Sequence, residues 1–299
     1  MKKNNIAFKV SVVTIIINTL LSIIKLIAGI VSNSDAMISD GIHTISDVFT
    51  TIIAIIGILI SSKKADDGHR YGHERLECIA SLILSFSLFL TGVGIGYSGI
   101  LSIINKEYVD TISPGVFALI VAIISIVVKE LMYQYTIKAA KVINSDVLKA
   151  DAWHHRTDSI SSVGALLGII LSRIGYKYFD PLASVFISIF ICKVAVEIFM
   201  DATDKLVDKS CDIDKVNEII KTVLSEKDVL GIDDIKTRMF GNKVYVDIEI
   251  SLDGDKTLFE THAIAEKVHD KVENHFPDVK HSMVHVNPYL DVLKKWKKY

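Results

Sequence analysis

Long apolar runs fill the first two thirds of the chain, whereas charged residues are concentrated in the last third. A helix that crosses a bilayer needs roughly 20 mostly apolar residues, and six segments are long enough. They cover residues 7–31, 36–60, 78–104, 115–137, 147–173 and 182–203. The pattern therefore predicts an α-helical membrane protein, with a six-helix transmembrane domain at residues 1–209 and a soluble domain at residues 210–299.

The last 90 or so residues have the shorter periods of a small soluble domain. Thr257 and Glu260 have the spacing of a capping box, which opens a helix. The predicted elements are a helix at 214–226, strands at 232–239 and 244–251 around a turn at 240–243, a helix from 257 to about 275 and a strand at 282–286. This α-β-β-α-β order predicts an α+β domain with a modest core, which would gain stability by dimerising.

Composition agrees with a membrane protein and excludes other classes. Half of the residues are hydrophobic, and the mean hydropathy is +0.41. The net charge of -2 gives no basic footprint for nucleic-acid binding. The three cysteines are far apart and form no CxxC pair, so the sequence predicts no disulfide framework.

The orientation of the spans follows from basic residues in the short loops. The first apolar run continues to about Val31, which is too long for a signal peptide, so we expect it to be retained as a span. Lysines and arginines are concentrated in the loops after the second and fourth spans. We therefore expect a multi-pass protein of the inner cell membrane, with both termini in the cytoplasm.

Ionisable residues interrupt the second and fifth spans. Charged groups at membrane depth are costly and usually mark an ion pathway or pair with one another. The spans share a His-x-x-x-Asp spacing, which places both side chains on one helix face; the residues are His43, Asp47, His154 and Asp158. Two imidazoles and two carboxylates form a tetrahedral ligand set that suits Zn²⁺. Four protein ligands leave no position for a catalytic water, as a carrier requires.

The same residues have a simpler interpretation, in which they form a buried polar network that holds two helices together. One motif alone would leave the two interpretations balanced, whereas two copies on two helices favour a metal site. Asp40 fits a mouth residue or a partner of the ligands, and Asp151 fits a wet entrance or a further ligand. We expect His155 and Arg156 to form structural pairs. Histidine ligands exchange metal for protons near neutral pH, which motivates a metal/proton antiporter.

Residues 39–47 and 150–158 resemble the second-span and fifth-span motifs of the cation diffusion facilitator family. The resemblance covers nearly the whole chain and implies a metallochaperone-like cytoplasmic domain. It also implies a homodimeric metal-ion/proton antiporter that works by alternating access, with a transport site formed by His43, Asp47, His154 and Asp158. A His-Asp/His-Asp set resembles the zinc-type members. Members with Asp, Asn or Tyr in place of His43 include carriers of other metals, so Mn²⁺, Fe²⁺ and Cd²⁺ are alternative cargoes.

The resemblance implies two further metal sites. Asp66, His69 and His73, in the loop after the second span, match a loop site of some members, although a short polar loop is the simpler interpretation. In the soluble domain, the resemblance aligns four residues with a regulatory zinc site: Asp233, Glu249, His262 and His285. Two carboxylates stand there in place of frequent histidines, which gives the site a harder character. We expect His269, His275 and His281 to be solvated surface residues.

The leading hypothesis is therefore a zinc efflux transporter whose partners are the lipid bilayer, divalent metal ions, protons and a second copy of the chain. A hypothesis from another class is a membrane metal sensor, or an assembly partner, that binds metal without moving it. The sequence contains no nucleotide-binding loop, no nucleophile–base motif and no HExxH. It therefore favours neither an enzyme nor an ATP-driven pump.

Overall fold

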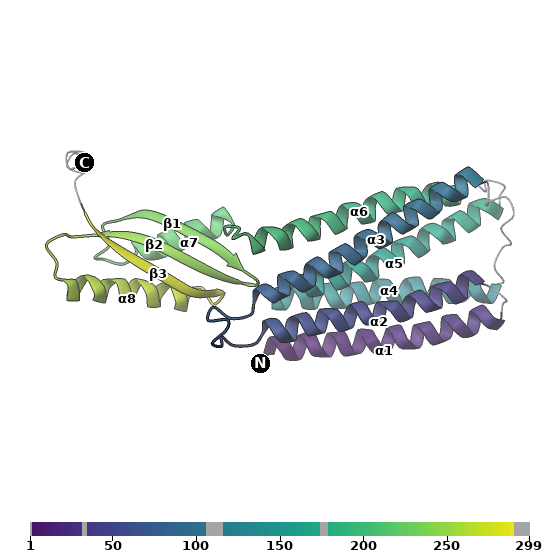
Figure 1. The fold of residues 1–299 in the computed structure, drawn as a ribbon, viewed down its shortest axis with the longest axis horizontal. Helices are drawn as coiled ribbons and strands as arrows, with labels where there is room; N and C mark the ends of the chain where they lie inside the picture. The colour runs from purple at the N-terminus through teal and green to yellow at the C-terminus, as the bar shows by residue number, and fades with distance from the viewer. Residues whose placement is uncertain (1, 32–34, 106–115, 174–178, 290–299) are drawn as a thin grey trace. The chain divides into compact units, whose positions relative to one another are not determined.

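The computed structural model describes residues 2–31, 35–105, 116–173 and 179–289 (Figure 1). The chain divides into two compact units, Met1–Thr203 and Asp204–Tyr299. Each unit is described by itself below.

The first unit is a bundle of long helices that run alongside one another (Figure 1). The helices are α1 (Lys2–Val31), α2 (Asp35–Ser61), α3 (Arg75–Asn105), α4 (Val116–Ile143), α5 (Asp146–Arg173) and α6 (Phe179–Leu206). Every predicted span is thus a helix, and most extend beyond the predicted ends. Among the described residues, α1 to α4 each contain a segment long and apolar enough to cross a membrane.

All six helices contribute side chains to one buried apolar cluster, which includes Ala7, Ala54, Leu84, Ala140, Leu148 and Ile191. Many large apolar side chains point outward instead, as lipid-facing side chains do. Small residues allow close helix packing, as the glycines of α3 predict. A Cβ atom added at Gly92 would lie 2.8 Å from the Cys192 Sγ on α6, and one at Gly57 would lie 2.4 Å from the Ala80 Cβ on α3.

The second unit is a three-stranded sheet with two helices. Its elements are α7 (Ile213–Leu224), β1 (Gly231–Phe240), β2 (Lys243–Leu252), α8 (Leu258–His275) and β3 (Val279–Pro288), in the predicted α-β-β-α-β order. The central strand β2 pairs antiparallel with β1 and parallel with β3. Ile219 of α7, Ile248 of β2 and Val268 of α8 belong to one buried core.

The predicted capping box fixes the start of α8. The Thr257 Oγ1 accepts the backbone N–H of Glu260 at 3.4 Å, and the Glu260 carboxylate accepts the backbone N–H of Thr257 at 2.8 Å. These reciprocal bonds satisfy two donors that the first turn of a helix leaves free. The cap thereby positions the helix that carries His262, His269 and Glu273.

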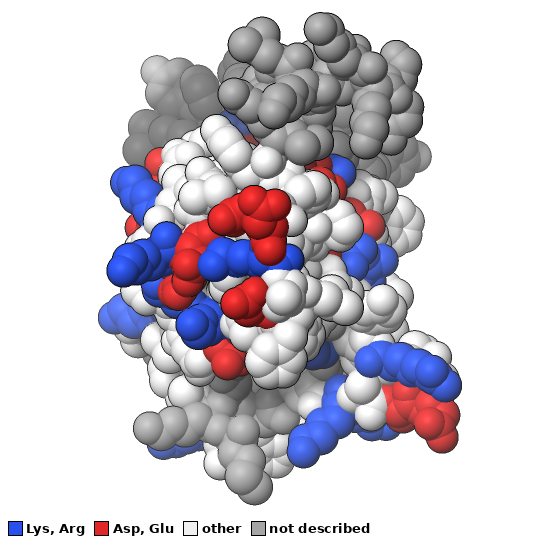
Figure 2. All heavy atoms as spheres, turned by 90° about the vertical axis from the view of Figure 1, so that its left-hand side faces the viewer, with Lys and Arg blue, Asp and Glu red and all other residues white. Residues whose placement is uncertain are grey.

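Acidic and basic side chains lie intermixed on the face shown in Figure 2. Such mixing agrees with the small net charge of the chain, -2. The described residues on this face therefore form no extended basic surface of the kind that binds phosphate backbones.

Candidate metal sites

Helices α2 and α5 bring two predicted transport ligands into direct contact. The Asp47 Oδ1 lies 3.1 Å from the His154 Nε2, and both side chains are buried. Asp158 lies one turn after His154 on α5, and donor atoms from these three residues all lie within 4.8 Å of one another. Ligand atoms bound to a tetrahedral zinc at 2.0–2.2 Å are separated by roughly 3.3–3.6 Å. The three donors are therefore close to the spacing that a small divalent ion needs.

The fourth predicted ligand, His43, lies on α2, four residues before Asp47. Its side chain lies outside the described part of the structure. Its membership of the site remains a prediction from helical spacing.

Lys129 of α4 lies in the predicted transport site, although the sequence analysis did not single it out. Its Nζ lies 2.5 Å from the Asp47 Oδ2 and 3.0 Å from the Asp158 Oδ2, and the residue is only 2% exposed. The ammonium thus bridges the two carboxylates of the proposed transport site. The sequence does contain a signal for this residue, which is a lysine within an apolar span. A buried ammonium needs an anionic partner, so such a lysine indicates a buried acidic side chain nearby. Spacing along α4 could not identify that partner.

A second buried lysine lies beside the first, on α1. The Lys25 Nζ contacts the Asp40 Oδ2 at 2.9 Å and the Thr44 hydroxyl at 3.0 Å. Asp40 is therefore the partner of a lysine and does not belong to the group of three metal-ligating residues. The interpretation of Asp40 as a mouth residue or a partner of the ligands stays a prediction.

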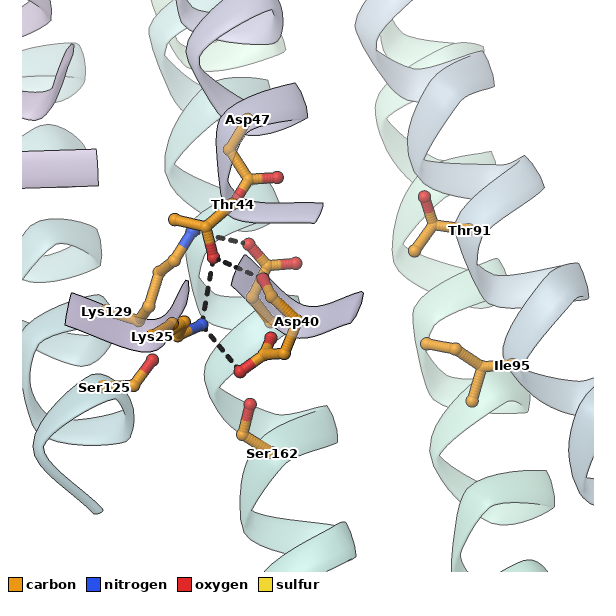
Figure 3. A pocket seen from close by; sticks show the side chains of 10 residues that line it. Lys25, Asp40, Thr44, Asp47, Thr91, Ile95, Ser125, Lys129 and Ser162 are labelled. Atoms are coloured by element: carbon orange, nitrogen blue, oxygen red, sulfur yellow. Dashed lines mark hydrogen bonds and ion pairs between the residues drawn. The ribbon is translucent and has the colours of Figure 1, made fainter. Parts of the chain in front are cut away.

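These groups face one cavity of about 60 Å³ in the described part of the bundle (Figure 3). Figure 3 shows Lys25 and Lys129 extending toward the carboxylates of α2, while Thr91 and Ile95 face the cavity from α3. The lining residues are Lys25, Asp40, Thr44, Asp47, Thr91, Ile95, Ser125, Lys129, Asp158 and Ser162. Carboxylates, hydroxyls and lysines line a space that can hold a small ion and its water.

Asp151 lies in the interior of the bundle rather than at a wet entrance. Its side chain is fully buried and accepts a hydrogen bond from the Thr51 hydroxyl at 3.1 Å. The His155 Nε2 lies 3.7 Å from the other Asp151 oxygen. Arg156 stacks over the Tyr133 ring at 4.4 Å. Arg156 thus has the expected structural partner, whereas neither ring nitrogen of His155 forms a hydrogen bond within the described residues.

The loop after α2 brings its three predicted ligands together. The Asp66 carboxylate lies 3.3 Å from the His73 Nε2 and 3.4 Å from the His69 Nδ1, and the three donors lie within 4.8 Å of one another. The backbone N–H of His69 donates to Asp66 at 2.7 Å, and this bond lowers the pKa of the Asp66 carboxyl. The loop therefore holds an ionised carboxylate beside two imidazoles.

The predicted set in the soluble domain is brought together only in part. The Asn287 side-chain amide donates to Asp233 at 3.0 Å and to Glu249 at 3.2 Å, and His285 pairs with Glu249 in the register of β2 and β3. His262 instead pairs with Glu266 one turn along α8, at 3.7 Å. Within the described residues, no group of three close metal-ligating atoms includes any of the four predicted residues.

A different group forms in the same domain, from His269, Glu273 and His281. His281 is exposed and His269 partly exposed, as expected of surface residues, but both imidazoles also lie 3.3 Å from the Glu273 carboxylate. Sequence spacing reveals the His269–Glu273 pair at i and i+4. It does not reveal that β3 brings His281 to them.

A bundle of apolar helices around buried metal-ligating side chains, joined to a small α+β domain, defines a membrane transporter for metal cations. Comparison with known families agrees. Residues 11–207 match the cation efflux transmembrane domain, and residues 211–289 match the cytoplasmic domain of cation efflux proteins. The chain therefore belongs to the cation efflux family, which is the cation diffusion facilitator family of the sequence resemblance. It is a divalent metal efflux transporter and belongs to a family of transporters rather than enzymes.

Several curated proteins are similar over nearly their whole length. The uncharacterized transporter MJ0449 of Methanocaldococcus jannaschii is 38% identical over 276 residues, which cover 92% of this chain and 96% of the relative. The manganese efflux system protein MneP of Bacillus subtilis is 33% identical, over 97% of this chain and 99% of the relative. The magnetosome protein MamB of Magnetospira sp. is 32% identical, over 88% and 89%.

Proposed function

We propose that the chain exports Zn²⁺ from the cytoplasm in exchange for protons, through a site of His43, Asp47, His154 and Asp158. The observation that carries this proposal is the buried contact between Asp47 and His154, with Asp158 in the same group of donors. Imidazole nitrogen favours zinc over the harder divalent cations. Histidine ligands must lose their protons to bind metal, so metal entry releases protons and proton entry releases metal.

Lys129 gives this cycle an internal cation. Two buried carboxylates without a cation would be costly in the bundle. In the described conformation the Lys129 ammonium lies between Asp47 and Asp158. An arriving metal ion takes over both carboxylates and displaces the ammonium, which returns when the ion leaves. The site thus contains a cation at each stage of transport.

The chain acts as a homodimer of the inner membrane, with both termini in the cytoplasm. The match of residues 211–289 to the cytoplasmic domain of cation efflux proteins supports the placement of this domain. Basic residues in the loops after the second and fourth spans support the same orientation. The loop group of Asp66, His69 and His73 and the soluble-domain residues Asp233, Glu249, His262 and His285 are proposed accessory sites for the same metal.

Manganese is the second candidate cargo. Two relatives from Bacillus subtilis are named manganese efflux system proteins, MneP at 33% identity and MneS at 32% identity. Asp47 and Asp158 supply the oxygen ligands that Mn²⁺ prefers. The fold, the site and the role of Lys129 are the same for this cargo.

Flux measurements in proteoliposomes test the proposal. Zn²⁺ and Mn²⁺ uptake would be compared with and without an imposed pH gradient, for the wild type, Asp47→Asn and Asp40→Asn. Asp40 provides a matched control, because its carboxylate lines the same cavity but lies outside the group of ligands. We expect gradient-dependent zinc flux that Asp47→Asn abolishes and Asp40→Asn largely retains.

The other outcomes separate the alternatives. Flux of manganese without zinc would establish the second candidate. Flux that ignores the pH gradient would refute proton exchange. Metal binding without flux of either ion would refute transport at this site and favour the sensor.

A further inference from the structure

Three metal-ligating side chains converge on the soluble domain, away from the residues that the family resemblance implies. His269 and Glu273 lie one turn apart on α8, and His281 lies on β3. One donor atom from each lies within 4.8 Å of the others. This group contains two imidazole nitrogens and one carboxylate, the composition of several three-ligand zinc sites.

A hydrogen bond fixes the His269 ring in the orientation of a metal ligand. The Nδ1 lies 2.7 Å from the backbone carbonyl oxygen of Ser282. A carbonyl oxygen only accepts, so the Nδ1 carries the hydrogen and the neutral ring has a bare lone pair at Nε2. Metal-binding histidines are held in this way, with the second nitrogen donating to a carbonyl or a carboxylate.

The free nitrogen of His269 points at another acceptor. The His269 Nε2 lies 3.3 Å from the Glu273 Oε1. A ring nitrogen with a lone pair and a carboxylate oxygen are both metal ligands. A zinc ion at this point would contact both groups without a large movement of either side chain.

The other two ligands are also held in place. The Glu273 Oε1 accepts the backbone N–H of Ser282 at 2.9 Å and lies 3.3 Å from the His281 Nδ1. The His281 ring packs against the ring of Tyr245, with centroids 6.2 Å apart. Both nitrogen–oxygen distances of 3.3 Å match the edge of a zinc tetrahedron, roughly 3.3–3.6 Å for bonds of 2.0–2.2 Å.

We propose that His269, Glu273 and His281 form a surface site for Zn²⁺ that is distinct from the transport site and from the set of Asp233, Glu249, His262 and His285. The three side chains are between 28% and 47% exposed, so water can occupy the fourth position. Bound metal links α8 to β3, which are otherwise joined by packing and by hydrogen bonds. The site thus makes the rigidity of this domain depend on the surrounding zinc concentration.

Equilibrium dialysis of the full-length chain in lipid nanodiscs tests this site. An Asp47→Asn background weakens the transport site and leaves the soluble domain unchanged. Bound zinc would be measured in this background alone and with His281→Ala, Glu273→Gln or His275→Ala added. His275 is the matched control, because it lies at the end of α8 outside the group. We expect His281→Ala and Glu273→Gln each to remove one tightly bound zinc per chain, and His275→Ala to remove none.

A second measurement reports on the link between α8 and β3. Zinc should slow amide hydrogen exchange in both segments of the background protein, and this slowing should disappear with His281→Ala. Circular dichroism would verify that each variant is folded. Equal zinc binding in His281→Ala, Glu273→Gln and His275→Ala would overturn the proposal, as would a cluster occupied by a proton that zinc does not displace. Neither readout depends on which ion the membrane domain transports.

Discussion

Replacement of Lys129 by methionine tests whether an internal cation competes with the cargo. Methionine has a similar length and is apolar, so it fills the same space without the charge. The change removes two hydrogen bonds to ionised groups, at 2.5 Å to Asp47 and 3.0 Å to Asp158. If an arriving metal ion must displace the ammonium, its removal should strengthen metal binding.

The size of this effect follows from the contacts. One hydrogen bond to a charged group contributes about 1.5–3 kcal/mol net. Metal entry breaks two of them, but a displaced ammonium regains part of its interaction with water and the cavity. Metal entry into the wild type therefore costs about one such bond net. Without Lys129 this cost is absent, so the Kd for metal should be roughly 10- to 150-fold lower in Lys129→Met. The metal-free protein should lose about 3–5 kcal/mol of stability, because two buried carboxylates are left without a cation.

Isothermal titration calorimetry of zinc and manganese binding in nanodiscs would measure the Kd at alkaline pH, where protons compete least. Lys25→Met is the matched control, because Lys25 lines the same cavity but pairs with Asp40. We expect tighter binding and slower turnover for Lys129→Met only. An unchanged or weaker metal affinity in Lys129→Met would refute the competition between ammonium and metal. Equally tighter binding in both variants would show that any positive charge near the cavity has the same effect, which would refute a specific role of Lys129.

Four further predictions concern other parts of the chain. Gly57→Ala should destabilise the bundle by about 1–3 kcal/mol, because the added Cβ would meet the Ala80 Cβ. Thermal unfolding in detergent should show this loss of stability. Gly94→Ala is the control and should cause no such loss, because the space around Gly94 is open. Thr257→Ala should cost about 1 kcal/mol of soluble-domain stability through loss of the cap. The backbone N–H of Thr257 lowers the pKa of Glu260. The resulting stabilisation of α8 should be complete above the ordinary glutamate pKa of about 4.3. It should disappear as the pH falls through the lower pKa that Glu260 has in the folded state. Hydrogen exchange in α8 would measure this pH dependence, and Glu260→Gln should remove it. In the exposed loop, His73→Ala should abolish any zinc-dependent protection of residues 66–73 from proteolysis, and protection that persists would exclude the loop site.

The sequence determined the elements of this protein because their signals are local. Apolar runs of bilayer length predicted the six long helices, and the capping box predicted where α8 begins. The repeated His-x-x-x-Asp spacing placed His154 and Asp158 on one face of α5 and singled out Asp47 on α2, since residues four apart on a helix share a face. The glycines of α3 permit a close neighbour, but only the packing of the bundle made that neighbour α6.

Contacts between elements depend on how the helices are rotated and packed, which no local period encodes. The burial of Lys129 in an apolar span required an anionic partner, but only the packing of α4 against α2 and α5 decided that its partners are Asp47 and Asp158. In the same way, the cost of an unpaired charge left the role of Asp151 open until the structure placed it beside Thr51. The pairing of β3 with β2 brought His281 to α8. The sequence alone thus determined which residues can bind a cation, and tertiary packing decided which of them meet, because burial requires each charge to find a partner across helices and strands.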